Sequence, residues 1–218
     1  MGLIKFVKVL LRCFNADKTK NTPFVLSDIT EYHRKSFSSH KIKILMVTDF
    51  SELSDNYTPI LAVNKCNKQG MNIQLDIYGQ GKDLNKIQKF IAKQNCPNIQ
   101  YKGIFQDFTT IYKDYDLFVT SSYTCDVQMN IVEAMRAKLP LILTDIKGHN
   151  ISEFIRGNGS IIPNHAANFY YETLKSFYSN KSQLMTMGQN SRKLYEEEFT
   201  IKPIVNKTIN IYREAWGV

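Results

Sequence analysis

From Lys41 to the C-terminus, short apolar segments alternate with longer segments that carry apolar residues at helical spacing. The segments expected to form strands cover residues 42–48, 72–78, 99–104, 117–120, 141–144 and 160–162. Strands separated by helical segments of about ten residues form βαβ units, in which the strands are parallel. Because the strands are largely apolar, both faces of the sheet should be covered. The pattern predicts an α/β fold, with a doubly wound parallel sheet of about six strands and helices on both faces.

The helical segments complete this pattern and end in a helical C-terminus. They cover residues 58–68, 84–94, 108–112, 129–137, 152–155 and, roughly, 166–178, 181–197 and 203–215. A doubly wound sheet binds its ligands beyond the carboxyl ends of its strands. The loops expected at that edge cover residues 48–57, 79–83 and 121–130.

The N-terminal segment, residues 1–40, lacks this alternation, so we expect one folded domain over residues 41–218. Residues 1–43 hold nine basic and three acidic residues and therefore carry +6 of the formal net charge of +8. A basic arm beside a nearly neutral domain favours an anionic neighbour, either phospholipid or nucleic acid. A solvated basic edge explains the charge equally well.

The sequence lacks the features of membrane-spanning, secreted and zinc-binding proteins. No apolar run approaches the roughly 18 residues of a membrane span, and Lys5, Lys8 and Arg12 interrupt the apolar N-terminus. No signal-peptide cleavage site follows it. The four cysteines form no CxxC pair and no metal-ligand spacing with the four histidines. These features predict reduced thiols in a cytoplasmic protein without a zinc site.

The stretch from Val119 to Glu153 joins a strand, a polar loop, a helix, a second strand and a glycine-containing turn. It reads VTSSYTCDVQMNIVEAMRAKLPLILTDIKGHNISE. This order, and the string IVEAMRAKLPLILTD above all, resembles the C-terminal, donor-binding domain of GT-B-fold retaining glycosyltransferases, the glycosyl transferases group 1 family. The resemblance covers about residues 41–218 and implies a Rossmann-like domain. It also implies transfer of a sugar from a UDP- or GDP-linked donor to a surface glycan with retention, near the inner membrane face.

Glu133 is the residue that this resemblance places at the donor nucleotide. In the family, a Glu here accepts hydrogen bonds from the ribose hydroxyls, because a carboxylate offers two acceptor oxygens to a diol. Asn130 and Glu133 also read as the N-cap and N3 residues of a capping box, so a structural role is the alternative. A helix that begins here would present the backbone amides of Asn130, Ile131 and Val132 to the diphosphate.

Two further loops complete the expected donor site. Gly79 and Gly81 follow the second expected strand, where glycines allow a tight turn and a close ligand approach. The same glycines also suit a plain connection from strand to helix. Lys82 follows them and either reaches a phosphate or lies in solvent. By resemblance, the loop at Ile104 and Phe105 holds the base.

The groups expected around the donor sugar depart from the family. Cys125 stands eight residues before Glu133, where the family has a second Glu that contacts the sugar. Asp126 is the neighbouring acid that could replace it, and both are expected to face the sugar. The run from Asp114 to Asp116 resembles a metal-binding DxD motif. It lies at a helix-to-strand junction, however, so we expect no metal and no cofactor besides the nucleotide-sugar substrate.

The loop after the first expected strand departs from the family as well. Asp49 and Asp55 stand where the family has an Arg and a Lys that hold the donor phosphates. With Glu52, they give this loop a charge of −3. Like charges at about 4 Å repel by roughly 4 kcal/mol at an effective dielectric constant of about 20. The loop therefore opposes a diphosphate unless basic groups elsewhere compensate.

Chain length leaves two classes of function open. Family enzymes carry an N-terminal acceptor-binding domain, of which residues 1–40 would be at most a remnant. The resemblance therefore implies either a partner chain that supplies this domain or a fragment of a longer protein. The alternative is a non-catalytic glycosyltransferase-like subunit or scaffold, favoured by the acidic loop and by Cys125. Either protein would contact an anionic membrane through residues 1–43. Nucleic-acid binding ranks last, because no aromatic-basic RNA motif is present.

Overall fold

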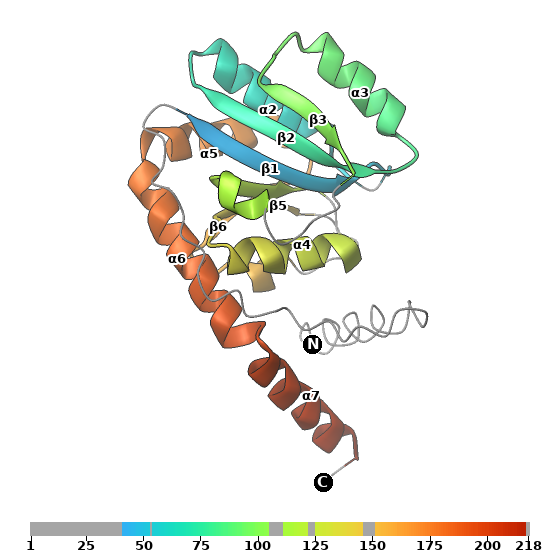
Figure 1. The fold of residues 1–218 in the computed structure, drawn as a ribbon, viewed down its shortest axis with the longest axis vertical. Helices are drawn as coiled ribbons and strands as arrows, with labels where there is room; N and C mark the ends of the chain where they lie inside the picture. Colours follow the sequence, from blue (N-terminus) through green and yellow to red (C-terminus); the bar gives the residue numbers. More distant parts are fainter. Residues whose placement is uncertain (1–40, 53, 105–110, 122–124, 146–150, 217–218) are drawn as a thin grey trace.

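The computed structural model describes residues 41–52, 54–104, 111–121, 125–145 and 151–216. These residues form one six-stranded sheet flanked by helices (Figure 1). Residues 1–40 lie outside the described part. Their role as a basic arm and the expected domain boundary near residue 40 therefore stay predictions.

The sheet is entirely parallel. Its strands are β1 (Ile42–Asp49), β2 (Ile73–Gln80), β3 (Ile99–Gly103), β4 (Leu117–Thr120), β5 (Leu141–Asp145) and β6 (Gly159–Pro163). Their order in the sheet is β3-β2-β1-β4-β5-β6. After β3, the chain returns to the middle of the sheet and adds β4 beside β1. The strand order therefore reverses between β1 and β4, which confirms the doubly wound, Rossmann-like prediction.

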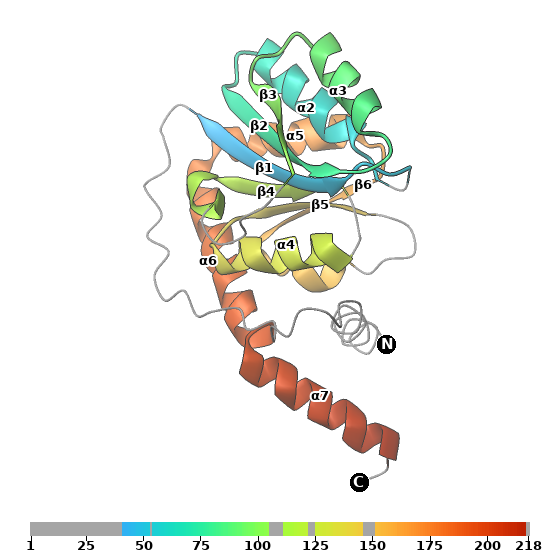
Figure 2. The same ribbon diagram turned by 45° about the vertical axis from the view of Figure 1, so that its right-hand side comes forward.

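Helices cover both faces of the sheet. They are α2 (Tyr57–Lys68), α3 (Leu84–Lys93), α4 (Cys125–Arg136), α5 (Ala167–Ser179), α6 (Lys181–Glu198) and α7 (Ile201–Trp216), with 3-10 helices η1 (Ile111–Asp114) and η2 (Ser152–Phe154). Helices α2, α3 and α5 lie on one face, and α4 and α6 lie on the other (Figures 1 and 2). The helical C-terminus is also confirmed.

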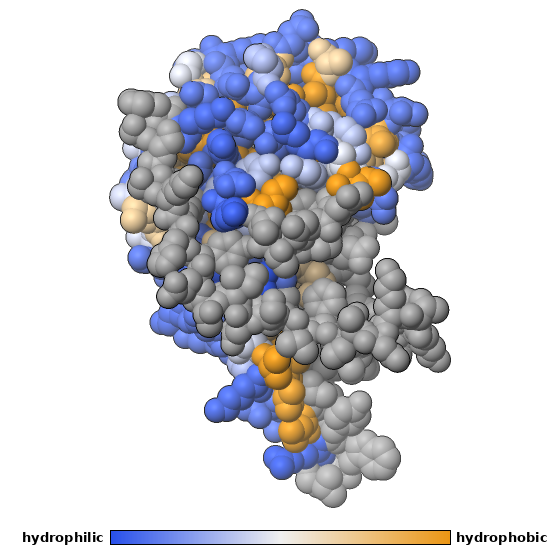
Figure 3. Space-filling model, viewed as in Figure 1, coloured by the Kyte–Doolittle hydropathy of each residue, from blue (hydrophilic) through white to orange (hydrophobic). Residues whose placement is uncertain are grey.

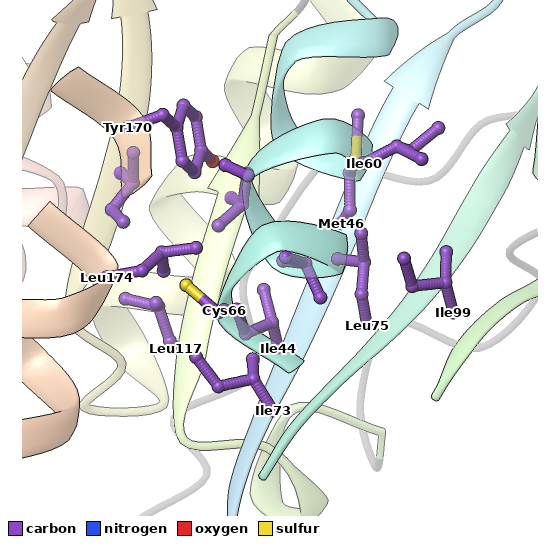
Figure 4. Packing of buried hydrophobic residues seen from close by; sticks show 14 of the residues in the cluster. Ile44, Met46, Ile60, Cys66, Ile73, Leu75, Ile99, Leu117, Tyr170 and Leu174 are labelled. Atoms are coloured by element: carbon purple, nitrogen blue, oxygen red, sulfur yellow. The ribbon is translucent and has the colours of Figure 1, made fainter. Parts of the chain in front are cut away.

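Alternating side chains along the central strands build the core on the face of α2 and α5. Ile44 and Met46 of β1 and Ile73 and Leu75 of β2 are fully buried against these helices (Figure 4). Side chains of a strand point alternately to the two faces, so residues two apart share one core. Cys66 of α2 lies in this core, and burial raises the pKa of its thiol to about 12. It therefore stays a protonated packing residue.

The core on the opposite face holds α4 against the middle of the sheet. Leu45 and Val47 of β1 and Phe118 of β4 are buried together with residues of α4 and α6. The hydroxyl of Ser191 on α6 donates to the carbonyl oxygen of Leu139, just after α4, at 2.6 Å. This contact fixes the C-terminal end of α4 relative to α6.

Helix α4 ends in a Schellman motif that places a lysine in a left-handed conformation. The Leu139 amide donates to the Ala134 carbonyl at 2.9 Å, and the Lys138 amide donates to the Met135 carbonyl at 3.0 Å. Lys138 has a φ of 60°. Glycine usually fills this position, because a Cβ atom makes the conformation unfavourable.

Helix α7 extends away from the sheet and its covering helices (Figures 1 and 2). Ile201, Val205 and Ile209 lie on one side of it and are 57%, 47% and 43% exposed. Figure 3 shows apolar side chains running along this part of the surface. Among the residues described, none of the helices has the length and apolar character needed to cross a bilayer.

The expected elements agree with the structure within two residues at most boundaries. Helix α4 is the exception, because it begins at Cys125, four residues before the expected start at residue 129. Part of the short helix expected at residues 108–112 lies outside the described residues. The 3-10 helix η1 begins at Ile111.

Candidate functional site

The strand order reverses between β1 and β4. Doubly wound sheets bind their ligands in the crevice that such a reversal forms at the carboxyl ends of the two strands. Strand β1 ends at Asp49 and leads to α2 on one face of the sheet. Strand β4 ends at Thr120 and leads to α4 on the other face. The two loops therefore diverge, and ligands of doubly wound sheets bind between such loops.

The β1–α2 loop is fixed to the end of β4 by hydrogen bonds. The Thr48 hydroxyl donates to the Asn56 side-chain oxygen at 2.7 Å, and the Ser121 hydroxyl lies 3.5 Å from the same oxygen. The Asn56 side-chain amide donates to the Asp49 carbonyl at 3.1 Å, and the Asp55 backbone amide donates to the Ser121 carbonyl at 3.2 Å. Sequence analysis did not single out Asn56 or Ser121, since their contact joins residues 65 positions apart.

Asp55 connects this loop to a third one. Its carboxylate is buried and accepts hydrogen bonds from the His165 backbone amide at 2.8 Å and the Thr58 backbone amide at 3.2 Å. The His165 ring nitrogen Nδ1 lies 3.5 Å from the same carboxylate. Asp55 therefore joins the β1–α2 loop, the end of β4 and the β6–α5 loop.

The other two acids of the β1–α2 loop also have partners. The carboxylate of Asp49 accepts hydrogen bonds from the hydroxyls of Ser51 and Ser54. Glu52 forms an exposed ion pair with Lys82 at 3.0 Å. The acidic loop is therefore built from structural contacts, and Lys82 offsets part of its charge.

Gly79 and Gly81 allow two backbones to approach each other. Their φ angles are +155° and +153°. A Cβ atom at Gly79 would collide with the Thr48 carbonyl oxygen, and one at Gly81 would lie 2.6 Å from the Phe50 carbonyl oxygen. The Phe50 amide donates to the Gln80 carbonyl at 3.0 Å. Packing against the end of β1 is thus sufficient to require both glycines, and contact with a ligand stays a prediction.

The early start of α4 corrects two expectations. Because the helix begins at Cys125, Asn130 and Glu133 lie in its interior, and the capping-box interpretation is wrong. The backbone amides of Asn130, Ile131 and Val132 do not form a helix N-terminus either, since their acceptors lie one turn earlier in the same helix.

Tyr112 gives the physical reason for the longer helix. This side chain is fully buried, and its hydroxyl donates to the Asn130 side-chain oxygen at 3.1 Å. It also lies 3.4 Å from the Asn130 carbonyl oxygen. Asn130 thus finds its polar partner on η1, so it fits inside a helix. From the sequence, Asn130 was expected at a helix start because asparagine favours such positions. Its partner Tyr112 is distant in the sequence and could not be foreseen.

Glu133 projects from α4 into an environment that is almost dry. Its side chain is 7% exposed, and its Oε2 atom lies 2.5 Å from Nη2 of Arg136, which is 3% exposed. Burial raises the pKa of Glu133 to about 7, and the positive charge of Arg136 opposes this increase. Sequence analysis missed Arg136, although residues three apart on a helix are neighbours.

The other expected contacts of the donor are only partly described. Cys125 and Asp126 are the first two residues of α4, but where their side chains point lies outside the described part of the chain. Ile104 directly follows β3 and is 55% exposed. Phe105 lies outside the described residues. The assignments of these four residues to sugar and base stay predictions.

Asp116 lies away from the crevice. Its backbone amide donates to the Lys43 carbonyl at 2.8 Å, and its carboxylate accepts from the Lys43 amide at 2.8 Å. These contacts join the beginnings of β4 and β1, at the sheet edge opposite the crevice. Asp116 therefore has a structural role in strand pairing.

Sequence comparisons give related proteins of one kind. The pattern of the family described as Glycosyl transferases group 1 matches residues 28–194. The poly(ribitol-phosphate) alpha-N-acetylglucosaminyltransferase of Staphylococcus aureus (strain COL) is 28% identical over 148 residues, which are 66% of this chain and 30% of the relative. The GtfA subunit of the Streptococcus agalactiae UDP-N-acetylglucosamine--peptide N-acetylglucosaminyltransferase is 34% identical over 107 residues, 48% of this chain and 21% of the relative. The Escherichia coli O-antigen biosynthesis glycosyltransferase WbnH is 29% identical over 153 residues, 70% of this chain and 43% of the relative.

Solved structures show the same fold. A point variant of S. aureus TarM, bound to fondaparinux, alpha-GlcNAc-glycerol and UDP, superposes with a TM-score of 0.69 at 23% identity. The match covers 93% of this chain and 41% of TarM. The pneumococcal O-GlcNAc transferase GtfA, bound to UDP and GlcNAc, gives 0.67 at 24% identity, over 83% of this chain and 36% of GtfA. The C-terminal domain of LpcC from Francisella tularensis, a group 1 family protein, gives 0.63 at 18% identity, over 73% of this chain and 87% of that domain.

The chain spans between 21% and 43% of the length of these three curated relatives. The family pattern, in contrast, covers most of the chain, including all six strands of the sheet. The strand order, the crevice beside α4 and the sequence relatives agree with one another. This chain belongs to the glycosyl transferases group 1 family.

Proposed function

We propose that this chain is the donor-binding part of a glycosyltransferase that transfers a sugar from a nucleotide-sugar to a surface-glycan acceptor with retention. Family membership supports the transfer reaction. The three relatives are named for N-acetylglucosamine transfer or for O-antigen biosynthesis. Two structural neighbours bind UDP, which favours a uridine-linked donor over a guanosine-linked one.

The observation that carries the proposal is the buried carboxylate of Glu133 on α4. This helix leaves the sheet directly from the crevice between β1 and β4. A nucleotide in that crevice would bring its ribose to α4, where a carboxylate can accept hydrogen bonds from both hydroxyls. Hydrogen bonds to a charged acceptor stabilise a complex more than neutral ones do.

The first turn of α4 is proposed to hold the diphosphate. The helix begins at Cys125, so the backbone amides of its first turn lie where the β4–α4 loop ends. Lys82, after β2, and Arg136, the last residue of α4, already contact Glu52 and Glu133. The helix N-terminus therefore supplies the phosphate contact that paired cations do not, and we propose no cofactor besides the substrate.

The remaining contacts follow the order of the loops around the crevice. Ile104 and Phe105 after β3 are proposed to contact the base. Cys125 and Asp126 at the start of α4 are proposed to face the sugar. The variants Cys125→Ser and Asp126→Asn should then change the preference among UDP-sugars and leave the affinity for UDP itself within about twofold.

A two-by-two binding experiment tests the role of Glu133. Calorimetric titration would compare UDP and 2′-deoxy-UDP on the unmodified chain and on Glu133→Gln, with GDP, ADP and CMP as further ligands. We expect the unmodified chain to bind UDP about tenfold more tightly than 2′-deoxy-UDP, since one charge-assisted hydrogen bond is lost. Glu133→Gln should remove most of this ratio.

The matched control is Glu172→Gln. Glu172 on α5 also contacts a basic residue three positions later, Lys175, but it is exposed and lies on the opposite face of the sheet. It should leave the ratio unchanged. A ratio that survives in Glu133→Gln would remove Glu133 from the ribose site, and failure of all four nucleotides to bind would overturn the donor site itself.

We also propose that a partner chain supplies the acceptor-binding half. The neighbour GtfA is known in a GtfA/B complex. The exposed apolar side of α7, formed by Ile201, Val205 and Ile209, offers a surface for such a partner. The purified chain should then bind UDP but release no UDP from UDP-N-acetylglucosamine with or without a glycan acceptor. Turnover by the chain alone would contradict the need for a partner.

A non-catalytic subunit is the second candidate function. Asp55 favours it, because this residue stands about where the resemblance expects a phosphate-binding Lys and is instead buried in structural contacts. Under this function, no nucleotide should protect the chain from thermal unfolding. A ligand at about 100 times its dissociation constant would otherwise add about 2.7 kcal/mol of stability.

The proposed location is the cytoplasm, with peripheral binding to the inner membrane face through residues 1–43. The +6 charge of this segment favours an anionic neighbour, and the lack of an aromatic-basic RNA motif in the sequence favours lipid over nucleic acid. Sedimentation with vesicles of phosphatidylglycerol, compared with phosphatidylcholine, tests this location. A triple variant with Lys5→Ser, Lys8→Ser and Arg12→Ser should abolish the preference for the anionic vesicles.

A further inference from the structure

A buried arginine lies one turn after Glu133 and contacts its carboxylate. Nη2 of Arg136 is 2.5 Å from Oε2 of Glu133, and the two side chains are 3% and 7% exposed. In the part of the chain that the structure describes, Arg136 is the one polar side chain in contact with this carboxylate. The contact recorded between the two side chains is made by Oε2.

The backbone that carries Arg136 is held in place. Its carbonyl oxygen accepts a hydrogen bond from Nη1 of Arg192 on α6 at 3.1 Å. The Ser191 hydroxyl fixes the following turn through the Leu139 carbonyl. At the other end of the same face, the Tyr112 hydroxyl binds Asn130. Glu133 thus lies between two fixed turns, and its ion pair has a defined geometry.

We propose that Arg136 is a positioning residue for nucleotide binding: it holds the Glu133 carboxylate through Oε2 and leaves Oε1 to accept a ribose hydroxyl. This inference rests on the proposed function of the same site. A buried carboxylate without a counter-charge takes up a proton, and a protonated carboxyl group loses acceptor capacity for a diol. The guanidinium stays charged at every relevant pH, so it favours the ionised form of the acceptor.

Other polar side chains that contact α4 do not replace Arg136. On α6, Nε of Arg192 pairs with Glu196 at 2.6 Å, and its Nη1 is directed to a carbonyl oxygen. On η1, the hydroxyl of Tyr112 is directed to Asn130. Arg136 is the cation that opposes the effect of burial on Glu133. Removal of its charge should therefore change the pH at which the nucleotide site becomes competent.

The experiment measures the dissociation constant of UDP between about pH 5.5 and 9 for the full chain and for Arg136→Met, Arg136→Lys and Arg192→Met. The unmodified chain should bind UDP more tightly as the pH rises, with a midpoint near the Glu133 pKa of about 7. Arg136→Met should shift this midpoint upward by about one pH unit or more and weaken binding at pH 7 about tenfold. Arg136→Lys keeps the charge and should restore most of the midpoint.

Arg192→Met is the matched control. It removes a neighbouring arginine that contacts the Arg136 backbone and not the Glu133 carboxylate, so its midpoint should equal that of the unmodified chain. Titration of Glu133 by carbon-13 NMR, without nucleotide, reads the same shift directly. If Arg136→Met does not fold, Arg136→Gln carries the test, because it also removes the charge beside Glu133 but keeps a polar side chain.

The outcomes separate this inference from the function on which it rests. If Glu133→Gln weakens UDP binding but Arg136→Met binds UDP equally or more tightly with an unchanged midpoint, Arg136 is a plain structural or competing ion pair, and the inference is overturned. If Glu133→Gln itself has no effect on UDP binding, the proposed donor site fails first. An upward shift in Arg136→Met, with rescue by lysine, supports both.

Discussion

At the scale of single residues, Glu133 and Arg136 form a buried ion pair on α4. The spacing of three residues is visible in the sequence and predicts neighbours on one helix face. Burial of both charges is not visible there, because it depends on α6 and η1 packing over α4. The same holds for Asp55, whose partner His165 lies 110 positions away. The residue types of the site could thus be predicted, but their charge states could not.

The raised pKa of Glu133 has a consequence for folding stability. Its pKa is about 7 in the folded chain and near the ordinary glutamate value of 4.5 in the unfolded chain. Between these values the folded state holds more protons, so the contribution of Glu133 is fully present below about pH 4.5 and is lost as the pH rises through about 7. Relative to Glu133→Gln, the unmodified chain should lose on the order of 3 kcal/mol of unfolding free energy over this window.

Urea unfolding of both proteins at several pH values measures this difference. The glutamine side chain does not titrate, so the loss of the Glu133–Arg136 ion pair in the variant adds an offset that is independent of pH. Glu172→Gln, at an exposed pair, should show little change with pH. A difference that stays constant from about pH 4 to 8 would show that Arg136 cancels the effect of burial on Glu133.

At the scale of elements, the strands were predictable because their signals are local. Apolar runs bounded by polar turns gave all six strands within two residues. The start of α4 was not predictable in this way. By residue type, Cys125 and Asp126 suit a loop, and Asn130 suits an N-cap position. In the structure, the Tyr112 hydroxyl binds Asn130, which lies inside the helix. A distant hydrogen bond therefore overrides a local preference.

The end of α4 yields a stability prediction. Lys138→Gly should raise the free energy of unfolding by about 0.5–1 kcal/mol, because glycine adopts the left-handed conformation without strain from a Cβ atom. This gain exceeds the added flexibility of the unfolded chain. Urea unfolding with an unchanged m-value measures it.

Lys93→Gly is the matched control for Lys138→Gly. Lys93 is the last residue of α3 and has no positive φ, so the same replacement should destabilise the chain by up to about 1 kcal/mol. Equal losses in both variants would mean that the contacts of the Lys138 side chain outweigh the strain in its backbone.

At the scale of the whole molecule, helix α7 projects from the α/β domain, and one side of this helix exposes apolar side chains. Val63 of α2 is 1% exposed, whereas Val205 of α7 is 47% exposed. Val63→Ala should cost about 2 kcal/mol of unfolding free energy, from lost burial and the cavity that remains. Val205→Ala should change it by less than about 0.5 kcal/mol.

The two alanine variants together report whether the chain in solution covers α7. Urea unfolding at two protein concentrations, with sedimentation equilibrium, provides the measurement. A cost at Val205 as large as that at Val63, increasing with protein concentration, would show that a second copy of the chain already covers this side. The expected small effect of Val205→Ala would mean that this side of α7 stays available to a different partner.

The contacts of Asp55 restrict how this chain can evolve. A mutation to lysine would supply a cation near the phosphate position but would remove the acceptor of the His165 and Thr58 amides in one step. Each buried donor left without an acceptor costs about 1–3 kcal/mol. Compensating changes in the β6–α5 loop would have to come first. A single substitution that introduces a phosphate-binding cation at position 55 would therefore produce a less stable protein.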